Sequence, residues 1–457
     1  MNNISALKIA LYGGDVTMKY FGTDGIRGKA NEFLSAELVL RLGRAAALLA
    51  QKNGDRRLLI GKDTRLSGDM LESALTAGLL SAGVDVYSLG VIPTPGVAAL
   101  CRAYGAPGAV ISASHNPYED NGVKFFSAEG HKLPDDVQDE IEALLDEALP
   151  VQEGIVIGRL HLVMDAVRQY ADFLLAAQKP DLSGIRLVID CANGAAVPIA
   201  VDLLSGLGAS VTAIADKPDG LNINLGCGST HPQLLQQTVL AKKAQLGLAL
   251  DGDADRLFAV DEKGNMADGD ILLAVMARYL HKSGQLAQDT LVVTQMCNMA
   301  LRLKLQEQGV RIAESQVGDR YVLEKMQQTG AVLGGEQSGH IILSRLNSTG
   351  DALAAALFLL SIMAESGQSL AELTADLQLF PQVHVNVPVI TKEGFATDAV
   401  IGTAIAAAEQ ELAGQGRVIV RASGTEQLFR VMTEGPEKAV LQRLSDSIAA
   451  AIRRRLG

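Results

Sequence analysis

One unit of strand, polar turn, helix and second strand recurs three times along the chain, and this repeat limits the fold more than any other feature. Apolar runs that alternate with helical patterns are typical of βαβ units, and a glycine after the helix is a common C-cap. The first predicted strands cover residues 58–60, 187–189 and 291–293, the helices end near Ala82, Leu207 and Gln308, and the second strands open with Gly83, Gly208 and Gly309. The sequence therefore predicts three related mixed α/β domains.

Each copy of the unit is followed by an apolar strand, a polar loop and another apolar strand. The polar loops cover residues 112–122, 251–256 and 334–340. Chance recurrence of a common unit would not place a polar loop at the same point each time, so we interpret the pattern as a true repeat. Each of the three domains is expected to present one such loop.

The last part of the chain departs from the repeat. Apolar runs at 418–420 and 428–432 predict a hairpin, and residues 437–455 predict a helix, which together make a smaller C-terminal α+β domain. A chain of 457 residues is too long for one core. We place the four domains at 18–165, 166–266, 267–382 and 383–457. Residues 1–17 look unlike the rest of the chain, so we interpret them as an N-terminal extension or artefact, with Met18 as a candidate start.

Charge and composition exclude several classes of partner. The formal net charge is -12, which disfavours a nucleic-acid partner, because phosphate backbones attract Lys and Arg. The longest apolar stretch, residues 352–364, is too short to span a bilayer and is expected to be a buried helix. Neither an export signal nor paired cysteine spacing is present, which favours a cytoplasmic protein with free thiols and no membrane partner. The cysteines are Cys101, Cys191, Cys227 and Cys297.

The first polar loop holds the candidate nucleophile. Ser114 lies in the sequence SASHNP, where Asn116 and Pro117 indicate a turn that exposes a serine at a strand end. Such a serine can act as a nucleophile or phosphoryl carrier, and Lys124 on the next strand could neutralise a phosphate or move a proton. His115 is adjacent in sequence only, and an ordinary Asn-Pro turn remains an alternative. No GxSxG elbow is present, which disfavours a hydrolase of that type.

The second loop, DGDADR, is a candidate metal site. Asp251, Asp253 and Asp255 would repel one another in an apolar setting without a cation, and carboxylate oxygens suit Mg²⁺ or Ca²⁺. Glu262 falls where the last ligand of an EF-hand would stand, but Arg256 occupies the position of the required glycine, and the flanks are typical of strands. We therefore expect Mg²⁺, with a solvated acidic turn as the alternative.

The third loop offers a carboxylate, an amide, a hydroxyl and an imidazole, which suit a polyhydroxylated ligand. These side chains belong to Glu336, Gln337, Ser338 and His340. Other polar turns look similar, and His340 could be a titrating group or a structural histidine.

The fourth loop, in the C-terminal domain, is a candidate phosphate site. Its successive amides can form an anion nest, and flanking arginines add bidentate contacts. The residues concerned are Arg421, Ser423, Gly424, Thr425 and Arg430. A plain hairpin turn is the alternative.

A serine, an acidic metal site, a hydroxyl-binding loop and a phosphate clamp together suit phosphoryl transfer between an enzyme serine and a phosphorylated sugar. The early segment 21–28 adds three glycines around Arg27, a pattern that suggests a backbone-shaped pocket with a cation.

From about Met18 to its C-terminus the chain resembles the α-D-phosphohexomutase superfamily. The resemblance rests on SASHNP, DGDADR, GEQSGH and RASGTE in this order, which is a highly specific set. The further elements FGTDGIRG, NGVKFF, NIN at 222–224 and CGSTHP at 227–232, together with Gln337, resemble bacterial members that act on glucosamine phosphates.

This resemblance implies four domains around a central cleft, an isomerase with one Mg²⁺ per chain, and a homodimer. Ser114 would be phosphorylated in the active enzyme, with a hexose 1,6-bisphosphate as candidate donor, and its phosphate would complete the coordination of the metal by the three aspartates. Glucosamine 6-phosphate would become glucosamine 1-phosphate through a 1,6-bisphosphate, and the product would feed UDP-N-acetylglucosamine and peptidoglycan synthesis.

The resemblance also implies roles for the remaining candidate residues. Arg27, Lys124 and Arg256 would flank the reacting phosphate, and proton transfer is left open between Lys124, Arg27 and His340. Glu336 and Ser338 would hold sugar hydroxyls. The fourth loop would grip the phosphate that is not transferred.

Two departures and three alternatives qualify the resemblance. Ala422 and Gln427 stand where relatives often have lysine and proline, which would loosen the fourth loop but leave its arginines and hydroxyls intact. A mutase of the same chemistry acting on glucose or mannose phosphates is the nearest alternative. A non-catalytic sugar-phosphate-binding protein and a Mg²⁺-dependent phosphatase are the others.

Overall fold

The computed structural model describes residues 20–22, 25–145, 156–423 and 426–457, so the predicted extension at 1–17 lies outside the described residues. The described chain divides into two compact units. The large unit contains residues up to 297 together with 305–376, and the small unit contains 298–304 and 377–457. Helix α9, Met299–Glu307, begins in the small unit.

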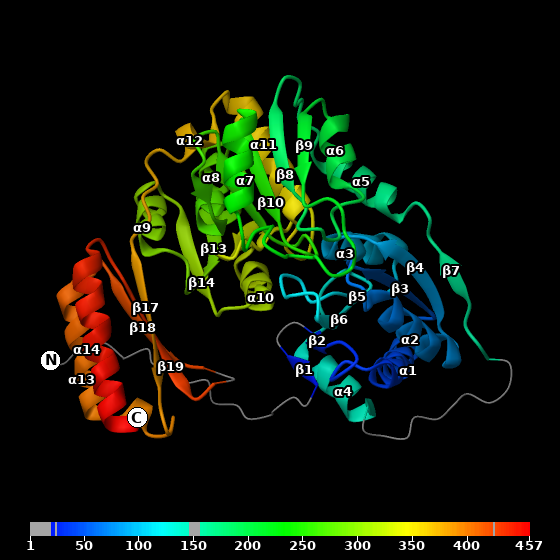
Figure 1. Ribbon diagram of the computed structural model, residues 1–457, viewed down its shortest axis with the longest axis horizontal. Helices are drawn as coiled ribbons and strands as arrows, with labels where there is room; N and C mark the ends of the chain where they lie inside the picture. The colour runs from blue at the N-terminus through cyan, green and yellow to red at the C-terminus, as the bar shows by residue number, and fades with distance from the viewer. Residues whose placement is uncertain (1–19, 23–24, 146–155, 424–425) are drawn as a thin grey trace. The chain divides into compact units, whose positions relative to one another are not determined.

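The first sheet of the large unit has seven strands in the order β1-β2-β6-β5-β3-β4-β7 (Figure 1). Its strands are β1 Phe21–Gly22, β2 Gly25–Lys29, β3 Arg57–Lys62, β4 Asp85–Val91, β5 Gly108–Ile111, β6 Asp120–Phe126 and β7 Leu160–Leu162. The helices of this region are α1 Ala36–Lys52, α2 Gly68–Ser81, α3 Thr94–Tyr104 and α4 Asp135–Leu145. Apolar residues of α1, α2 and α4 form one core with the sheet.

The second and third sheets are smaller. The second has the order β12-β11-β10-β8-β9, and the third has the order β14-β13-β15-β16. The second contains β8 Arg186–Asp190, β9 Ser210–Ile214, β10 Leu246–Leu250, β11 Leu257–Asp261 and β12 Met266–Ala267, with helices α5 Ala166–Ala177, α6 Ala200–Gly206 and α7 Gln233–Lys242. The third contains β13 Thr290–Thr294, β14 Arg311–Ser315, β15 Leu333–Gly335 and β16 Ile341–Leu343, with helices α8 Gly269–Lys282, α10 Asp319–Thr329, α11 Ala352–Ser366 and α12 Leu370–Leu373.

The four central strands have the same arrangement in all three sheets. The orders β6-β5-β3-β4, β11-β10-β8-β9 and β16-β15-β13-β14 correspond strand by strand. In each, the first two strands of the repeat are parallel, the third is parallel to the first, and the fourth returns antiparallel. The predicted repeat is therefore confirmed at the level of topology.

The sequence pattern predicted that a glycine opens the second strand of each repeat, and this prediction was wrong. Gly83, Gly208 and Gly309 have positive φ angles of 83°, 98° and 89°, and the strands begin two residues later. A left-handed residue ends the helix and turns the chain, and glycine adopts that conformation without a steric penalty. The helix of the second repeat also begins later than the pattern suggested, because residues 195–199 form turns and α6 starts at Ala200.

This topology places the polar loops. Each loop follows the carboxyl end of the third strand of its repeat, next to the carboxyl end of a parallel neighbour. Ligands of open α/β sheets bind at this edge.

Helix α11 confirms the prediction for the longest apolar stretch. Eleven of its fifteen residues are buried, and Asp351 caps its first turn by accepting a hydrogen bond from the Ala354 amide. No helix among the described residues combines the length and apolarity needed to cross a bilayer.

The small unit is a three-stranded antiparallel sheet, β17-β19-β18, with two long helices. Its elements are β17 Gln382–Pro388, α13 Ala399–Leu412, β18 Arg417–Ala422, β19 Leu428–Glu434 and α14 Lys438–Leu456. The predicted hairpin and terminal helix are both present. Apolar residues of the sheet, α13 and α14 form a separate core.

Candidate active site

Ser114 lies in the loop that connects β5 and β6. The sequence predicted an exposed serine, but its side chain is buried because the acidic loop packs against it. Its backbone has a positive φ of 52°. The hydroxyl donates to Asp251 Oδ2 at 2.7 Å, and the amide donates to Ser112 Oγ at 2.9 Å. The structure thus brings the candidate nucleophile of the first loop against the acidic second loop, 137 residues away in sequence.

His115 is half-buried beside this serine. Its Nδ1 lies 3.4 Å from Ser114 Oγ. Burial, and then the charges of Arg256 and Arg27, lower the pKa of His115 to about 4. The ring is therefore neutral near pH 7 in this state.

The three aspartates project from the loop between β10 and β11. All three are buried, and one oxygen from each lies within 4.8 Å of the others. Asp253 Oδ1 and Asp255 Oδ1 are buried without a hydrogen-bond partner in the described structure. Buried carboxylates without donors are costly unless a cation binds them, so this donor set fits a hard divalent ion. The flanking elements are strands, which excludes an EF-hand.

The pKa values of Asp251 and Asp255 are shifted in opposite directions. Burial, and then the carboxylates of Asp255 and Asp253, raise the pKa of Asp251 well above its ordinary value. Burial alone would raise the pKa of Asp255 as well, but the charges of His340, Lys124 and Arg256 hold it well below its ordinary value. Three adjacent carboxylates cannot all ionise without a compensating charge, and a bound cation would supply it.

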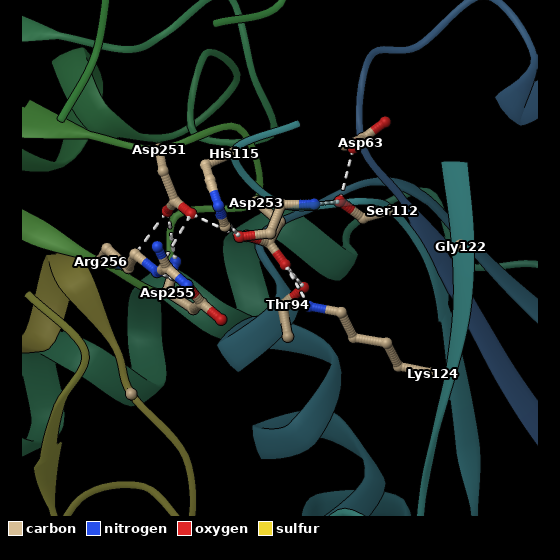
Figure 2. Close-up of polar contacts among 12 residues, drawn as sticks. Asp63, Thr94, Ser112, His115, Gly122, Lys124, Asp251, Asp253, Asp255 and Arg256 are labelled. Carbon is tan, nitrogen blue, oxygen red and sulfur yellow. Dashed lines mark hydrogen bonds and ion pairs between the residues drawn. The ribbon is translucent and has the colours of Figure 1, made fainter. Parts of the chain in front are cut away.

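Asp253 is bound by residues of the first repeat, one on α3 and one on β6. Thr94 Oγ1 donates to Asp253 Oδ2 at 2.7 Å, and Lys124 Nζ lies 2.9 Å from the same oxygen (Figure 2). The Thr94 amide also donates to the Asp253 carbonyl at 3.0 Å. The second oxygen of this carboxylate is the one left without a hydrogen-bond partner.

Two arginines complete the cationic surroundings. Arg27 on β2 pairs with Gly122 on β6, so it lies on the same face of the sheet as Lys124, two residues further along. Arg256 Nε lies 3.8 Å from Asp255 Oδ1 and 4.0 Å from Asp251 Oδ2. Lys124 and Arg256 therefore lie against the acidic loop, and Arg27 lies on the sheet face that carries Lys124.

The third loop meets the acidic loop through its backbone. The Leu257 amide donates to the Gly339 carbonyl at 3.0 Å, and Arg256 and His340 form an isolated β-bridge. His340 is buried, with Nδ1 3.4 Å from Asp255 Oδ2 and Nε2 accepting from the Gly350 amide at 2.8 Å. Both ring nitrogens thus contact the protein.

Glu336 has a hydrogen-bond partner among the described residues, whereas the Ser338 hydroxyl has none. Glu336 Oε1 accepts from the Gly318 amide at 3.1 Å. Ser338 Oγ is buried and has no hydrogen-bond partner in the described part of the chain.

The fourth loop belongs to the small unit. Arg421 and Arg430 stand directly opposite each other on β18 and β19. Like charges in that position are destabilising. Arg430 donates to Glu426 Oε2 at 3.2 Å, and two exposed guanidinium groups side by side fit a phosphate site. Ser423 is buried at the end of β18, whereas Gly424 and Thr425 lie outside the described residues.

Several residues of the site were missed at the sequence level. Thr94 contacts Asp253, and Lys392 Nζ donates to the Ser423 carbonyl at 2.6 Å, which adds a cation to the fourth loop. Asp63 and Arg65, which follow β3, lie beneath the Ser114 loop (Figure 2 shows Asp63). None of these has a local sequence signal, because the contacts come from distant parts of the chain.

Four models of the phosphoglucomutase/phosphomannomutase family match the chain in order. They are α/β/α domain I at residues 18–151, domain II at 164–264, domain III at 268–380 and the C-terminal domain at 385–451. The predicted fold class is thus confirmed, and fold and site define an isomerase of the phosphohexomutase class. The family acts on sugar phosphates, and its chemistry together with the aspartate cluster indicates a metal cofactor.

Comparison with individual proteins narrows the class. A phosphoglucosamine mutase from Desulforamulus reducens is 52% identical over 439 residues, which cover 95% of this chain and 99% of that protein. The chain therefore belongs to the phosphoglucosamine mutase family within the α-D-phosphohexomutase superfamily, as its motifs indicated.

Solved structures share the fold. A phosphoglucomutase/phosphomannomutase family protein from Burkholderia thailandensis matches with a TM-score of 0.79 and 25% identity, covering 94% of this chain and 96% of that one. An Aspergillus fumigatus N-acetylphosphoglucosamine mutase, solved with GlcNAc-6P and magnesium, matches with a TM-score of 0.69 and 19% identity over 95% of both chains.

Proposed function

We propose that the protein interconverts glucosamine 6-phosphate and glucosamine 1-phosphate, with Ser114 as phosphoryl carrier and a 1,6-bisphosphate as intermediate. The observation that carries this proposal is the 2.7 Å contact between Ser114 Oγ and Asp251, within a buried cluster of three carboxylates. The choice of sugar rests on the family, whose close member from Desulforamulus reducens is a phosphoglucosamine mutase.

The cofactor we propose is one Mg²⁺ per chain, held by Asp251, Asp253, Asp255 and the phosphate on Ser114. The two unpartnered carboxylate oxygens support this assignment. When bound, the ion would neutralise charge on the transferring phosphoryl group. The Aspergillus fumigatus structure with magnesium, which shares the fold, agrees with the choice of metal.

The transfer follows from the residues around Ser114. The phosphoryl group leaves Ser114 Oγ for the 1-hydroxyl of the sugar, and that hydroxyl loses its proton. After the bisphosphate turns around, the 6-phosphoryl returns to Ser114 Oγ and the 6-oxygen takes up a proton. Arg27, Lys124 and Arg256 would stabilise the negative charge, and His115 lies beside the reacting oxygen.

Proton transfer is assigned among Lys124, Arg27 and His340. Both ring nitrogens of His340 contact other protein groups, at Asp255 and Gly350. Lys124 Nζ is likewise paired with Asp253, at 2.9 Å, so all three residues stay candidates.

Substrate binding is assigned to the third and fourth loops. Glu336 and Ser338 would hold sugar hydroxyls, and the unpartnered Ser338 Oγ supports this role. The phosphate that is not transferred would bind to Arg421, Ser423, Gly424, Thr425 and Arg430, supported by the opposed pair of arginines.

The test is intact mass and peptide mapping of the purified protein before and after glucose 1,6-bisphosphate, paired with an assay of glucosamine 6-phosphate isomerisation in Mg²⁺. We expect one phosphate on Ser114 that rises and falls with isomerase activity. Folded protein that takes up no phosphate and isomerises nothing would refute the proposal, and release of inorganic phosphate would indicate a phosphatase.

A second candidate is a mutase of the same mechanism acting on glucose or mannose phosphates, which the name of the matched family models favours. Parallel kinetics on three hexose phosphates decide between the two. A cytoplasmic location is proposed on the free cysteines, and a homodimer is proposed on the resemblance. Light scattering on the purified protein tests the dimer.

A further inference from the structure

Arg65 uses its whole side chain to hold the loop that carries Ser114. It follows β3, and its guanidinium group is buried. Nε donates to Asp63 Oδ2 at 2.9 Å. The remaining donors go to backbone carbonyls of the loop, which are those of Ser114 at 2.9 Å, Asn116 at 2.9 Å, Pro117, and Asp120 at 3.0 Å. A guanidinium has five N–H donors, and here each of its nitrogens contacts an acceptor.

Asp63 extends the same network to the other side of Ser114. Its Oδ2 accepts from Ser112 Oγ at 2.5 Å, and that hydroxyl accepts from the Ser114 amide at 2.9 Å. The Asp63–Arg65 pair therefore controls both backbone groups of the phosphoryl carrier. None of these contacts reaches the Ser114 hydroxyl.

Asn224, from the second repeat, binds the same carbonyls. Its Nδ2 donates to the Ser114 carbonyl at 2.9 Å and to the Asn116 carbonyl at 3.1 Å. Gly252 permits this close packing, because a Cβ at that position would lie 2.5 Å from the Ser114 carbonyl oxygen. Two donors from separate parts of the chain thus converge on one carbonyl.

The conformation held in this way is an unfavourable one. Ser114 has a φ of 52°, in the left-handed region that side chains other than glycine seldom adopt. Such a residue persists only where its surroundings impose it, and the hydrogen bonds from Arg65 and Asn224 do so. In this conformation the hydroxyl points at Asp251.

We propose that Arg65 is a positioning residue for phosphoryl transfer, which acts with Asn224 through the carbonyls of Ser114 and Asn116. The inference rests on the proposed function, because the hydroxyl it aims is the phosphoryl carrier. Without these donors the backbone of Ser114 relaxes from its left-handed conformation. Its hydroxyl oxygen is then no longer aligned with the transferred phosphoryl group. A displacement of about 1 Å is enough to lower a rate about a hundredfold.

The test is the single-turnover rate constant for phosphate transfer from saturating glucose 1,6-bisphosphate to Ser114, followed by intact mass. We expect a fall of about a hundredfold in Arg65→Met and about tenfold in Arg65→Lys and Asn224→Leu, with less than about a threefold change in the bisphosphate concentration for half-maximal rate. The Arg65→Met/Asn224→Leu double variant should be close to Arg65→Met, because both residues hold the same carbonyls.

Arg186→Met is the matched control. Arg186 also donates Nε and Nη2 to a backbone carbonyl, that of Lys243, but from an exposed position. The Arg186→Met variant should transfer phosphate to Ser114 at the wild-type rate. A rate constant does not depend on the folded fraction, so partial misfolding of Arg65→Met cannot imitate the effect, and Asn224→Leu decides the matter if Arg65→Met does not fold.

The outcomes separate the two proposals. Wild-type protein that takes up no phosphate would overturn the proposed function. If the wild-type protein takes up phosphate and Arg65→Lys and Asn224→Leu do so with the same rate constant, only the positioning role is overturned. The positioning role would also be contradicted if the effects of the two substitutions on the rate constant were purely additive in the double variant. So would a change only in the bisphosphate concentration for half-maximal rate.

Discussion

At the scale of single residues, the acidic loop shows how burial decides chemistry. Asp251, Asp253 and Asp255 are ordinary carboxylates in the sequence, but the structure removes all three from water. Their pKa values then separate, with that of Asp251 raised and that of Asp255 lowered. The site is in this sense incomplete without a cation, and the stability of the protein should depend on one.

We predict that Mg²⁺ raises the thermal midpoint of the protein and that Asp255→Asn removes this response. A ligand at a hundred times its Kd stabilises by about 3 kcal/mol, and the variant lacks one of the three charges that bind it. Differential scanning fluorimetry with EDTA or with Mg²⁺ measures the shift.

Asp261→Asn is the control for this prediction. Asp261 is a buried aspartate of the adjacent strand β11 that accepts hydrogen bonds from Lys263 and Asn265. We expect it to lower the midpoint but to keep the Mg²⁺ response. An unchanged response in Asp255→Asn would contradict the assignment of the metal site.

At the scale of elements, the periodicity of the sequence predicted most strands of the repeat, but the close contact of α1 and α2 was not visible in it. A Cβ on Gly78 of α2 would overlap the Leu40 carbonyl oxygen and lie 2.9 Å from the Gly43 Cα. Helix propensity alone disfavours glycine at such positions. The reason for the two glycines is therefore the distance between the helices.

We predict that Gly78→Ala destabilises the large unit by about 1–3 kcal/mol, because the added methyl group forces the helices apart. Gly402→Ala in α13 is the matched change, since a Cβ there meets no atom within 4 Å. It should stabilise the small unit by about 0.5–1 kcal/mol through helix propensity. Urea unfolding followed by circular dichroism checks both, and equal effects of the two changes would refute the explanation.

At the scale of the whole molecule, buried polar side chains connect the three repeats of the large unit. Tyr170 on α5 donates its hydroxyl to Asp351 Oδ1 at 2.8 Å, at the start of α11. Asn347 donates to Asp351 Oδ2 and to the Pro95 carbonyl, both at 3.0 Å. Asp351 thus binds α5 of the second repeat directly, and Asn347 links the same carboxylate to α3 of the first repeat.

We predict that Tyr170→Phe lowers the unfolding free energy of the large unit by about 1–3 kcal/mol, because it leaves a buried carboxylate with one donor fewer. Tyr279→Phe is the comparison, since its hydroxyl binds Glu365 at an exposed site and its loss should cost less than about 0.5 kcal/mol. Urea midpoints measure both, and an equal loss in the two variants would contradict the role of the network.

The three repeats, the C-terminal hairpin and helix, and the chemical type of each polar loop could be predicted from the sequence. These features are encoded locally, in hydrophobic periodicity and in side chains a few residues apart. Three contacts could be found only in the folded protein: Ser114 faces Asp251, His340 lies against Asp255, and Asn224 holds a carbonyl 110 residues away. Those contacts depend on how the sheets pack, and packing is set by burial and shape over the whole chain, which no local pattern records.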